Sequence, residues 1–292
     1  MRNRRPQQGV ALISVLLITA LVTLIISGML ARQRLSVASS ANQLQQQQLW
    51  QLALSGEAWA REQVRRDLNT DDGKLRVHLG QHWAKSAGEF EIEDGRIRIR
   101  LEDLGARFNL DRLRNHNDDL NRARYQRLLA QLGLTPHDPA SLPATPGYDH
   151  KLQPFADSSD LRRLLALDAA GWQRLQPWVA TTANASLNVN TASAELLATL
   201  ESLDSNIARS LVQQRPANGY KSVQAFLEQP LLQGLQVNGA GLAVSSHNFR
   251  ATLDVALGER RLRLVSDLRT NSDGQVQVLR RQLVAPDRPL SE

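Results

Sequence analysis

An uninterrupted stretch without charge runs from Val10 to Leu30 and consists almost entirely of apolar residues. At about 1.5 Å per residue, a helix of this length crosses the hydrocarbon core of a bilayer, which is about 30 Å thick. Arg2, Arg4 and Arg5 precede the stretch, and such a basic segment favours the cytoplasm. The pattern therefore predicts a transmembrane helix over residues 10–30, with the bulk of the chain on the far side of the membrane.

The helical pattern continues beyond the apolar stretch, because the next proline is Pro136 and apolar or small residues recur on one face. We expect residues 31–68 to extend the same helix into water. The members of the apolar face are Leu49, Leu52, Ala53, Gly56, Ala60 and Val64. Two pairs with i,i+4 spacing are expected to form ion pairs on the opposite face: Glu57 with Arg61, and Glu62 with Arg66.

Two later regions alternate with the period of a β-strand. In the first, the two-residue turn Asp94-Gly95 separates two alternating runs and predicts a hairpin. The apolar positions of that hairpin are Phe90, Ile92, Ile97, Ile99 and Leu101. The second region predicts three more strands, joined at Gly258-Glu259 and Asp273-Gly274, with apolar positions at Phe249, Ala251, Leu253, Val255, Leu257, Leu262, Leu264, Val276 and Val278.

Between the strand regions, from Leu113 to Gly239, the apolar residues follow a helical period. Pro136, Pro139, Pro143 and Pro146 mark an irregular loop inside this region. The helical runs are expected around Tyr125, Leu128, Leu129 and Leu132; around Leu161, Leu164 and Leu165; around Leu196, Leu197 and Leu200; and around Ile207, Leu211 and Val212.

The predicted fold class is α+β: a long N-terminal helix, an antiparallel sheet packed on it, and an all-helical domain inserted between the strands. The sheet domain takes residues 69–112 and 240–285, and the inserted helical domain takes residues 113–239. Residues 286–292 form a tail.

Gly9 lies directly before the apolar stretch, whereas a secretory signal peptide has its small-residue cleavage site after it. A basic leader that ends in glycine and is followed at once by an apolar helix resembles the leader of a prepilin. This resemblance implies cleavage between Gly9 and Val10, with residues 1–9 as the leader. The alternative is a plain signal anchor that keeps its N-terminus.

The amino-acid composition excludes several kinds of catalytic and metal-binding site. The chain has no cysteine, which excludes thiol catalysis, thiolate metal sites and disulfides. Its formal net charge is +6, and about half of that excess is lost if the arginines of the leader are removed. The charge therefore does not point to nucleic acid.

Three segments carry a resemblance to a known family. They are LEDLGARFNLDRL (101–113), PFADSSDLRRLLALDAAGWQRLQPWV (154–179) and LNVNTASAELLATL (187–200). Together with the leader and the terminal strands, they resemble the minor pseudopilin K family of type II secretion systems, also called general secretion pathway protein K. In the third segment we expect Thr191 to cap a helix that carries Glu195 in its first turn.

The resemblance implies a structural subunit rather than an enzyme, anchored by one span in the inner membrane with its bulk in the periplasm. It implies processing by the prepilin peptidase, methylation of the new N-terminus, and assembly with the minor pseudopilins called I and J and with the major pseudopilin. Ser14 occupies the fifth mature position, where most pilin-like proteins carry glutamate. Members of this family lack that glutamate, which suits a subunit at the filament tip that initiates or caps the pseudopilus.

The family resemblance also implies calcium, which prefers oxygen ligands. The candidate ligands are Asp118, Asp119, Asp157 and Asp160. Turns and helix caps explain these residues equally well.

Two other functions compete with this interpretation. The Asn-Val-Asn-Thr-Ala opening also occurs in helix-hairpin-helix modules that bind DNA, but the turn after it, Glu201 to Asn206, has two acidic residues and no glycine. The alternative function is therefore a membrane-anchored periplasmic protein that binds DNA through a helix-hairpin-helix module. Because the turn lacks glycine and carries acidic residues, we do not expect nucleic acid to be a partner. A signal-anchored enzyme lacks a recognisable set of catalytic residues. His78 and His82 have the spacing of helical zinc ligands, but Gly80 lies between them and the glutamate of a metalloprotease pair is missing.

Overall fold

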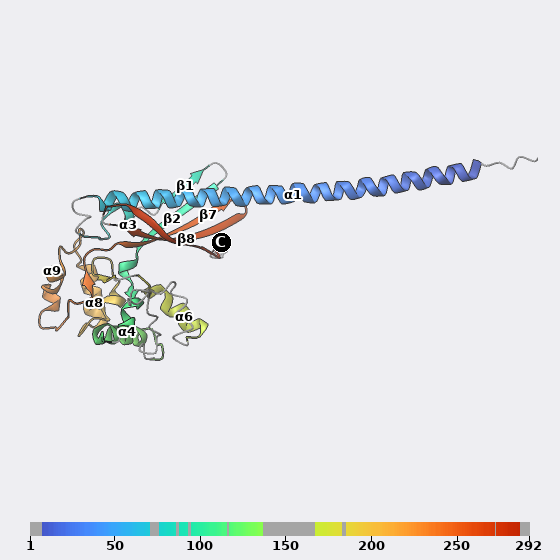
Figure 1. Ribbon diagram of the computed structural model, residues 1–292. Coiled ribbons are helices and arrows are strands. Elements are labelled where there is room, and N and C mark those ends of the chain that lie inside the picture. The colour runs from blue at the N-terminus through green and yellow to red at the C-terminus, as the bar shows by residue number, and fades with distance from the viewer. Residues whose placement is uncertain are drawn as a thin grey trace, which may run out of the picture. The chain divides into compact units, whose positions relative to one another are not determined.

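The computed structural model describes residues 8–70, 76–85, 88–92, 95–115, 117–136, 167–182, 185–271 and 273–286. The chain divides into two compact units, residues 1–52 and 53–292. A single α-helix, α1 (Gln8–Leu68), begins in the first unit and ends in the second (Figure 1). The expected helical extension therefore ends at Leu68.

Within the second unit, the last turns of α1 pack on a β-sheet through small residues. Ala53, Ala60 and Val64 are fully buried. A Cβ atom added at Gly56 would lie 2.7 Å from the Leu253 side chain, so glycine at this position lets the helix lie close to the sheet. The predicted apolar face of this part of the helix is thereby confirmed.

The sheet has five antiparallel strands in the order β1-β2-β7-β8-β9. Its inner face covers α1 with alternate apolar residues, because successive side chains of a strand point to opposite faces. Ile97, Ile99 and Leu253 are almost completely buried on that face. The strands are β1 (Gly88–Ile92), β2 (Gly95–Asp103), β7 (Asn248–Leu257), β8 (Arg260–Thr270) and β9 (Val276–Val284).

Two-residue connections join β1 to β2 and β7 to β8, and one of these two turns was placed wrongly. Residues 271–275, which include the expected Asp273-Gly274, connect β8 to β9. Gly258-Glu259 connects β7 and β8 as expected, because Leu257 pairs with Arg260. Gly258 has a φ of +56°, which suits the first central position of a type II′ turn. In the first hairpin Gly95 is already part of β2 and pairs with Ile92. The turn was therefore predicted one residue too late, and residues 93–94 lie outside the described part.

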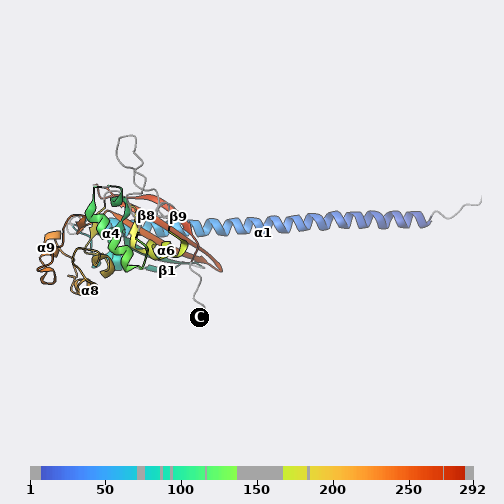
Figure 2. The same cartoon turned by 90° about the horizontal axis from the view of Figure 1, so that it is seen from below.

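The sequence between β2 and β7 leaves the sheet and forms a separate layer, in which α4, α6, α8 and α9 gather below the sheet in Figure 1 and lie partly in front of it when seen from below in Figure 2. This segment begins after Asp103, the last residue of β2, and ends before Asn248, the first residue of β7. The helices of this segment are η1 (Leu104–Ala106), η2 (Leu110–Arg114), α4 (Asp119–Gln131), α6 (Ala169–Leu175), η4 (Gln176–Trp178), α7 (Ala194–Leu197), α8 (Ser205–Gln213), α9 (Val223–Leu227) and η5 (Pro230–Leu232). Short parallel pairs join β3 (Phe108–Asn109) to β4 (Val179–Ala180) and β5 (Leu187–Asn188) to β6 (Leu242–Ala243). A further short helix, α3 (His82–Lys85), precedes β1.

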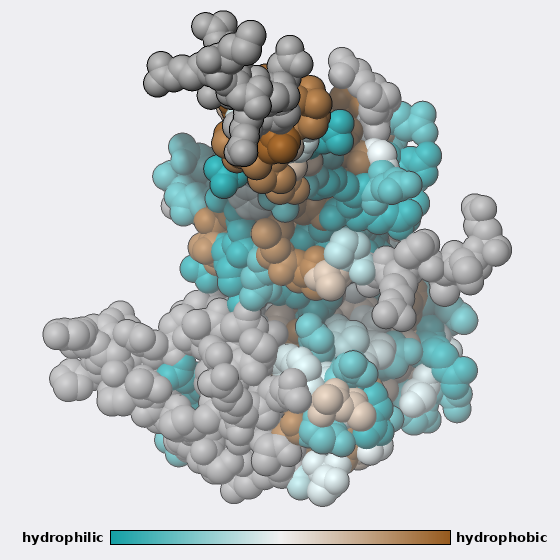
Figure 3. All heavy atoms as spheres, turned by 90° about the vertical axis from the view of Figure 1, so that its right-hand side faces the viewer, coloured by the Kyte–Doolittle hydropathy of each residue, from teal (hydrophilic) through white to brown (hydrophobic). Residues whose placement is uncertain are grey.

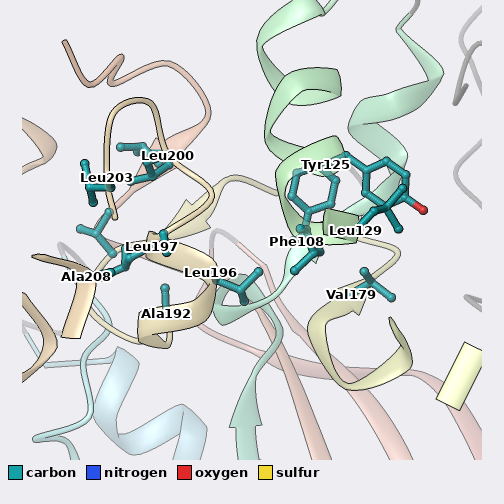
Figure 4. Close-up of a cluster of buried hydrophobic side chains, with 14 of the residues drawn as sticks. Phe108, Tyr125, Leu129, Val179, Ala192, Leu196, Leu197, Leu200, Leu203 and Ala208 are labelled. Atoms are coloured by element: carbon teal, nitrogen blue, oxygen red, sulfur yellow. The ribbon is translucent and has the colours of Figure 1, made fainter. Parts of the chain in front are cut away.

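A hydrophobic cluster holds this segment together. Tyr125 and Leu129 of α4 pack beside Phe108 and Val179, while Leu196 and Leu197 of α7 lie on the other side of the cluster (Figure 4). The helical runs expected near Tyr125, Leu196 and Leu211 are confirmed by α4, α7 and α8. The run expected at Leu161, Leu164 and Leu165 lies outside the described residues, as does most of the proline loop. The α+β fold class is confirmed.

Candidate functional site

The first candidate site is the apolar part of α1. It is the one helix among the described residues that is long and apolar enough to cross a membrane. The side chains of residues 12–30 are all exposed, and the apolar ones colour that part of the surface brown in Figure 3. The hydroxyls of Thr19 and Thr23 donate to the backbone oxygens of Leu16 and Thr19, at 2.9 and 2.7 Å. The helix therefore satisfies these polar groups internally, as a lipid environment requires.

The predicted processing residues lie at the start of this helix. Gly9 and Val10 belong to the backbone of α1, but their side chains are outside the described part. Ser14 lies one turn further along and is exposed. It offers a hydroxyl where the pilin pattern has a carboxylate.

A second candidate site is a buried polar node where the inserted segment meets the sheet. The Asp103 carboxylate, at the end of β2, is 3% exposed. It accepts hydrogen bonds from the Gly105 amide at 2.7 Å, the Asn188 amide group at 2.9 Å and the Thr191 hydroxyl at 2.6 Å. The Ser246 hydroxyl is its fourth partner. Burial raises the pKa of Asp103, while these four donors act in the opposite direction.

This node corrects one expectation. Thr191 does not cap a helix, since its hydroxyl donates to Asp103 instead. The N-cap of α7 is Ser193, whose hydroxyl accepts from the Leu196 amide. Serine and threonine are both favoured N-cap residues, but only Thr191 was predicted, and its long-range hydrogen bond to Asp103 removes its hydroxyl from that role. Asp103 was missed for the same reason, because its partners are remote in sequence.

The third candidate site is another buried polar node, which joins α1 to the sheet. Glu57 is 2% exposed and accepts from the Ser266 hydroxyl at 2.6 Å and from Arg281 at 2.7 and 2.8 Å. Burial raises the pKa of Glu57, but the bonds from Arg281 and Ser266 prevail and lower it. The expected exposed pair of Glu57 with Arg61 is wrong, because Arg61 donates to the Val276 backbone oxygen. The pair of Glu62 with Arg66 is confirmed at 2.8 Å.

The hairpin between α7 and α8 is where a helix-hairpin-helix module would bind phosphate. Here the Asp204 carboxylate accepts from the amides of Asn206 and Ile207, both at 2.8 Å. A carboxylate of the chain thus occupies amides that a phosphate would need. Ser202 takes a left-handed φ of +60° in the turn, the conformation that glycine adopts most easily.

Glu201 of the same turn belongs to a buried ion pair. It accepts from Arg124 at 2.9 Å through each of its two oxygens, and from Arg127 at 3.3 Å. The remaining bonds of Arg124 reach the backbone oxygens of Asn238 and Ala240, both at 2.7 Å. Arg124 therefore links α4, the hairpin and the segment before β6. Arg215 is partly buried and donates to the Ala192 backbone oxygen.

Glu201 should make stability depend on pH. Burial opposes ionisation, but the Arg124 hydrogen bonds and charge lower its pKa to about 2. A carboxyl with a lowered folded-state pKa stabilises the fold above its unfolded pKa of about 4.3, and this contribution is lost as the pH falls toward 2. We expect Glu201→Gln to be less stable than the wild type at pH 7, and the gap to shrink at pH 3. Urea unfolding at both values measures it, with exposed Glu91→Gln as control. A gap that is constant with pH would contradict this role.

The predicted calcium ligands are engaged otherwise where they are described. Asp118 is the N-cap of α4 and accepts from Asn121, and Asp119 pairs with Arg122. Asp157 and Asp160 lie outside the described residues. His78 accepts from the Gly80 amide and His82 contacts Asp67, so the two rings have different partners. Among the described residues, no three His, Asp or Glu side chains group as a metal site.

Comparisons with known proteins agree with one another. Residues 187–245 match the family model of type II secretion system protein K. The chain is 36% identical to type II secretion system protein K of Pseudomonas aeruginosa, over 96% of its own length and 94% of the relative's. It is 35% identical to the protein of that name from Klebsiella pneumoniae, over 87% of this chain and 90% of the relative.

A solved structure resembles the fold as well. It is the crystal structure of the GspK-GspI-GspJ complex from the type 2 secretion system of enterotoxigenic Escherichia coli. The match has a TM-score of 0.72 and 25% sequence identity, and it covers 85% of this chain and 99% of the matched chain.

Proposed function

The chain belongs to the type II secretion system protein K family, and from this membership we propose that it is the minor pseudopilin at the tip of the pseudopilus, where it initiates or caps the filament. The role is structural: the subunit takes part in protein export across the outer membrane by assembly rather than by catalysis. The observation that carries the proposal is one continuous helix, apolar at its start and packed on a sheet at its end.

The proposed anchoring follows from the first part of α1. Residues 10–30 span the inner membrane once, and the rest of the chain lies in the periplasm, because the basic residues precede the span. The prepilin peptidase cleaves between Gly9 and Val10, and the new N-terminus is methylated. Ser14 supports a tip position, because a serine cannot form the charge pair that a glutamate at that position would form with the terminal amine of another subunit.

The proposed partners are the other minor pseudopilins of the I and J types and the major pseudopilin. The likeness to the chain in the GspK-GspI-GspJ complex supports this assembly. The inserted segment, 104–247, adds bulk beside the sheet that a subunit within a helical stack would have to accommodate. This bulk also supports a place at the end of the filament.

The mature N-terminus tests the proposal directly. Mass spectrometry of the full chain, produced in cells with and without the prepilin peptidase, is expected to find Val10 as the first residue only when the peptidase is present. In the matched variant Gly9→Leu the chain should keep residues 1–9 in both strains. An uncleaved wild-type chain in the presence of the peptidase would contradict processing and leave a plain signal anchor.

Calcium binding stays a prediction from the family resemblance. Asp118 already caps α4 and Asp119 pairs with Arg122, so the test concerns Asp157 and Asp160. Addition of calcium should raise the melting temperature of the wild type and leave the Asp157→Asn/Asp160→Asn variant unchanged. An equal response of both chains would exclude these two residues as ligands.

A further inference from the structure

Asparagine followed directly by glycine occurs twice in the chain, at Asn218-Gly219 and at Asn238-Gly239. Both asparagines are exposed and lie outside the helices and strands of the inserted segment. Asparagine is chemically labile, and a following glycine has no side chain to keep its amide nitrogen away from the carboxamide. The reacting atoms of the two pairs are identical, so any difference between them comes from the surrounding structure.

At Asn238 the side-chain carbonyl group is already polarised. Its Oδ1 atom accepts a hydrogen bond from the Ala240 amide at 2.8 Å. A donor on a carbonyl oxygen stabilises the negative charge that an attacking nucleophile places on that oxygen. A bond to the second residue ahead also directs the carboxamide toward the peptide group that follows Asn238, and this group contains the Gly239 nitrogen.

The two glycine nitrogens differ in their hydrogen bonds. Among the described residues, no acceptor binds the Gly239 amide. The Gly219 amide is buried and donates to the Pro216 backbone oxygen at 2.8 Å. Deprotonation of the Gly219 nitrogen would break that bond, which opposes its use as a nucleophile. The surroundings therefore favour reaction at Asn238 and oppose it at Asn218.

We propose that Asn238 is a site of spontaneous deamidation that the fold selects. The Gly239 nitrogen loses its proton to water and attacks Cγ of Asn238, so that a new C–N bond forms. The bond from Cγ to Nδ2 then breaks, and Nδ2 leaves as ammonia, which gives a cyclic imide. Water opens the imide at either carbonyl group and leaves aspartate or isoaspartate at position 238. Nothing is oxidised or reduced, and water is the co-reactant.

The proposed site lies beside the buried pair of Arg124 and Glu201. Arg124 donates to the backbone oxygens of Asn238 and Ala240, both at 2.7 Å. The Asn238 amide donates to Glu201 at 3.2 Å. Isoaspartate carries the backbone through the side chain, which lengthens it, and leaves a new carboxylate close to that of Glu201. The reaction is therefore expected to loosen the hold of Arg124 on the segment before β6.

Peptide mapping by mass spectrometry measures both reactions in one sample. The full chain is kept in neutral detergent at mildly alkaline pH, once folded and once unfolded in urea. In the folded chain we expect Asn238 to react about tenfold faster than Asn218, and at least as fast as Asn238 reacts in urea. In urea the two asparagines should react at rates within about twofold of each other, because both local structures are lost.

Gly239→Ala is the matched variant. A Cβ atom added at this position would lie 3.2 Å from a methyl group of Leu227 and 3.3 Å from one of Val223. The added methyl group hinders the attack, so the reaction at Asn238 should slow by about tenfold, while the reaction at Asn218 should keep its rate. The urea midpoint of the wild type should fall as Asn238 reacts, whereas the midpoint of the variant should stay constant.

Three outcomes would contradict these expectations. If Asn238 reacted no faster than Asn218 in the folded chain, the fold would not select it. If Asn238 reacted several-fold more slowly in the folded chain than in urea, the structure would protect the residue rather than activate it. Either result overturns the proposed site. A constant wild-type midpoint after Asn238 has reacted would overturn the link to Arg124.

Discussion

Replacement of Asp103 by alanine is expected to lower the free energy of unfolding by about 3–5 kcal/mol, because it removes the acceptor that several buried neutral donors share. The carboxylate is almost fully buried and accepts from Gly105, Asn188 and Thr191. Alanine would remove the acceptor that these buried donors share, and each buried hydrogen bond that is lost in this way costs about 1–3 kcal/mol. Urea unfolding of the full chain, followed by tryptophan fluorescence, measures the loss.

Two further variants make the Asp103 experiment specific. Thr191→Val removes a single donor and should cost about 1–2 kcal/mol. Asp119→Ala removes a carboxylate that is 86% exposed and should change stability by less than about 0.5 kcal/mol. If Asp103→Ala behaved like Asp119→Ala, the node would not join the sheet to the inserted segment.

Replacement of Arg124 by methionine is expected to have an effect of similar size, about 3–5 kcal/mol. The Arg124 side chain is 3% exposed and satisfies both oxygens of Glu201 and two backbone oxygens. Methionine fills much of the volume but donates no hydrogen bond. Glu201 would then be left largely buried with only Arg127 beside it, and the same unfolding experiment should detect the loss.

A double-mutant cycle separates the ion pair from packing. Arg124→Met with Glu201→Met should cost less than the sum of the single changes, because the double variant leaves no unpaired charge. Arg122→Met, on the same helix but in an exposed pair with Asp119, should cost less than about 0.5 kcal/mol. Additive costs in the cycle would show that Arg124 acts through packing rather than through Glu201.

The family, the fold class and most of the described secondary structure could be predicted from the sequence. Secondary structure has local signals in the sequence, and the family is indicated by the order in which several short motifs follow one another. An uncharged stretch of 21 residues, an apolar period of 3.6 and an apolar period of two each show which face of a segment is apolar, whatever that face packs against. The hairpin at β1 and β2 was found this way, although its turn was predicted one residue too late. The error arose because Asp94-Gly95 is a favoured turn pair whose alternatives differ little in local energy.

Glu57 shows where local rules fail. Its i,i+4 spacing to Arg61 is a genuine helical signal, yet Glu57 lies on the buried side and pairs with Arg281, more than 200 residues later. Its neighbour Glu62, which stays at the surface, obeys the local rule. Glu57 is buried and Glu62 is not, and a rule based only on sequence spacing does not take burial into account.

The sequence by itself determined the long N-terminal helix, the five strands of the antiparallel sheet and the mainly helical character of the segment between them, because hydrophobic periodicity depends on each segment alone. It did not predict the short strands β3 to β6 inside that segment. Only the tertiary structure decided that Asp103, Glu57 and Arg124 are buried nodes, that Ser193 rather than Thr191 caps α7, and that the arginines of β2 and the carboxylates of β1 and β7 share one face. The physical reason is that a buried polar group must find its partner wherever the fold brings one, and that partner lies tens to hundreds of residues away in the chain.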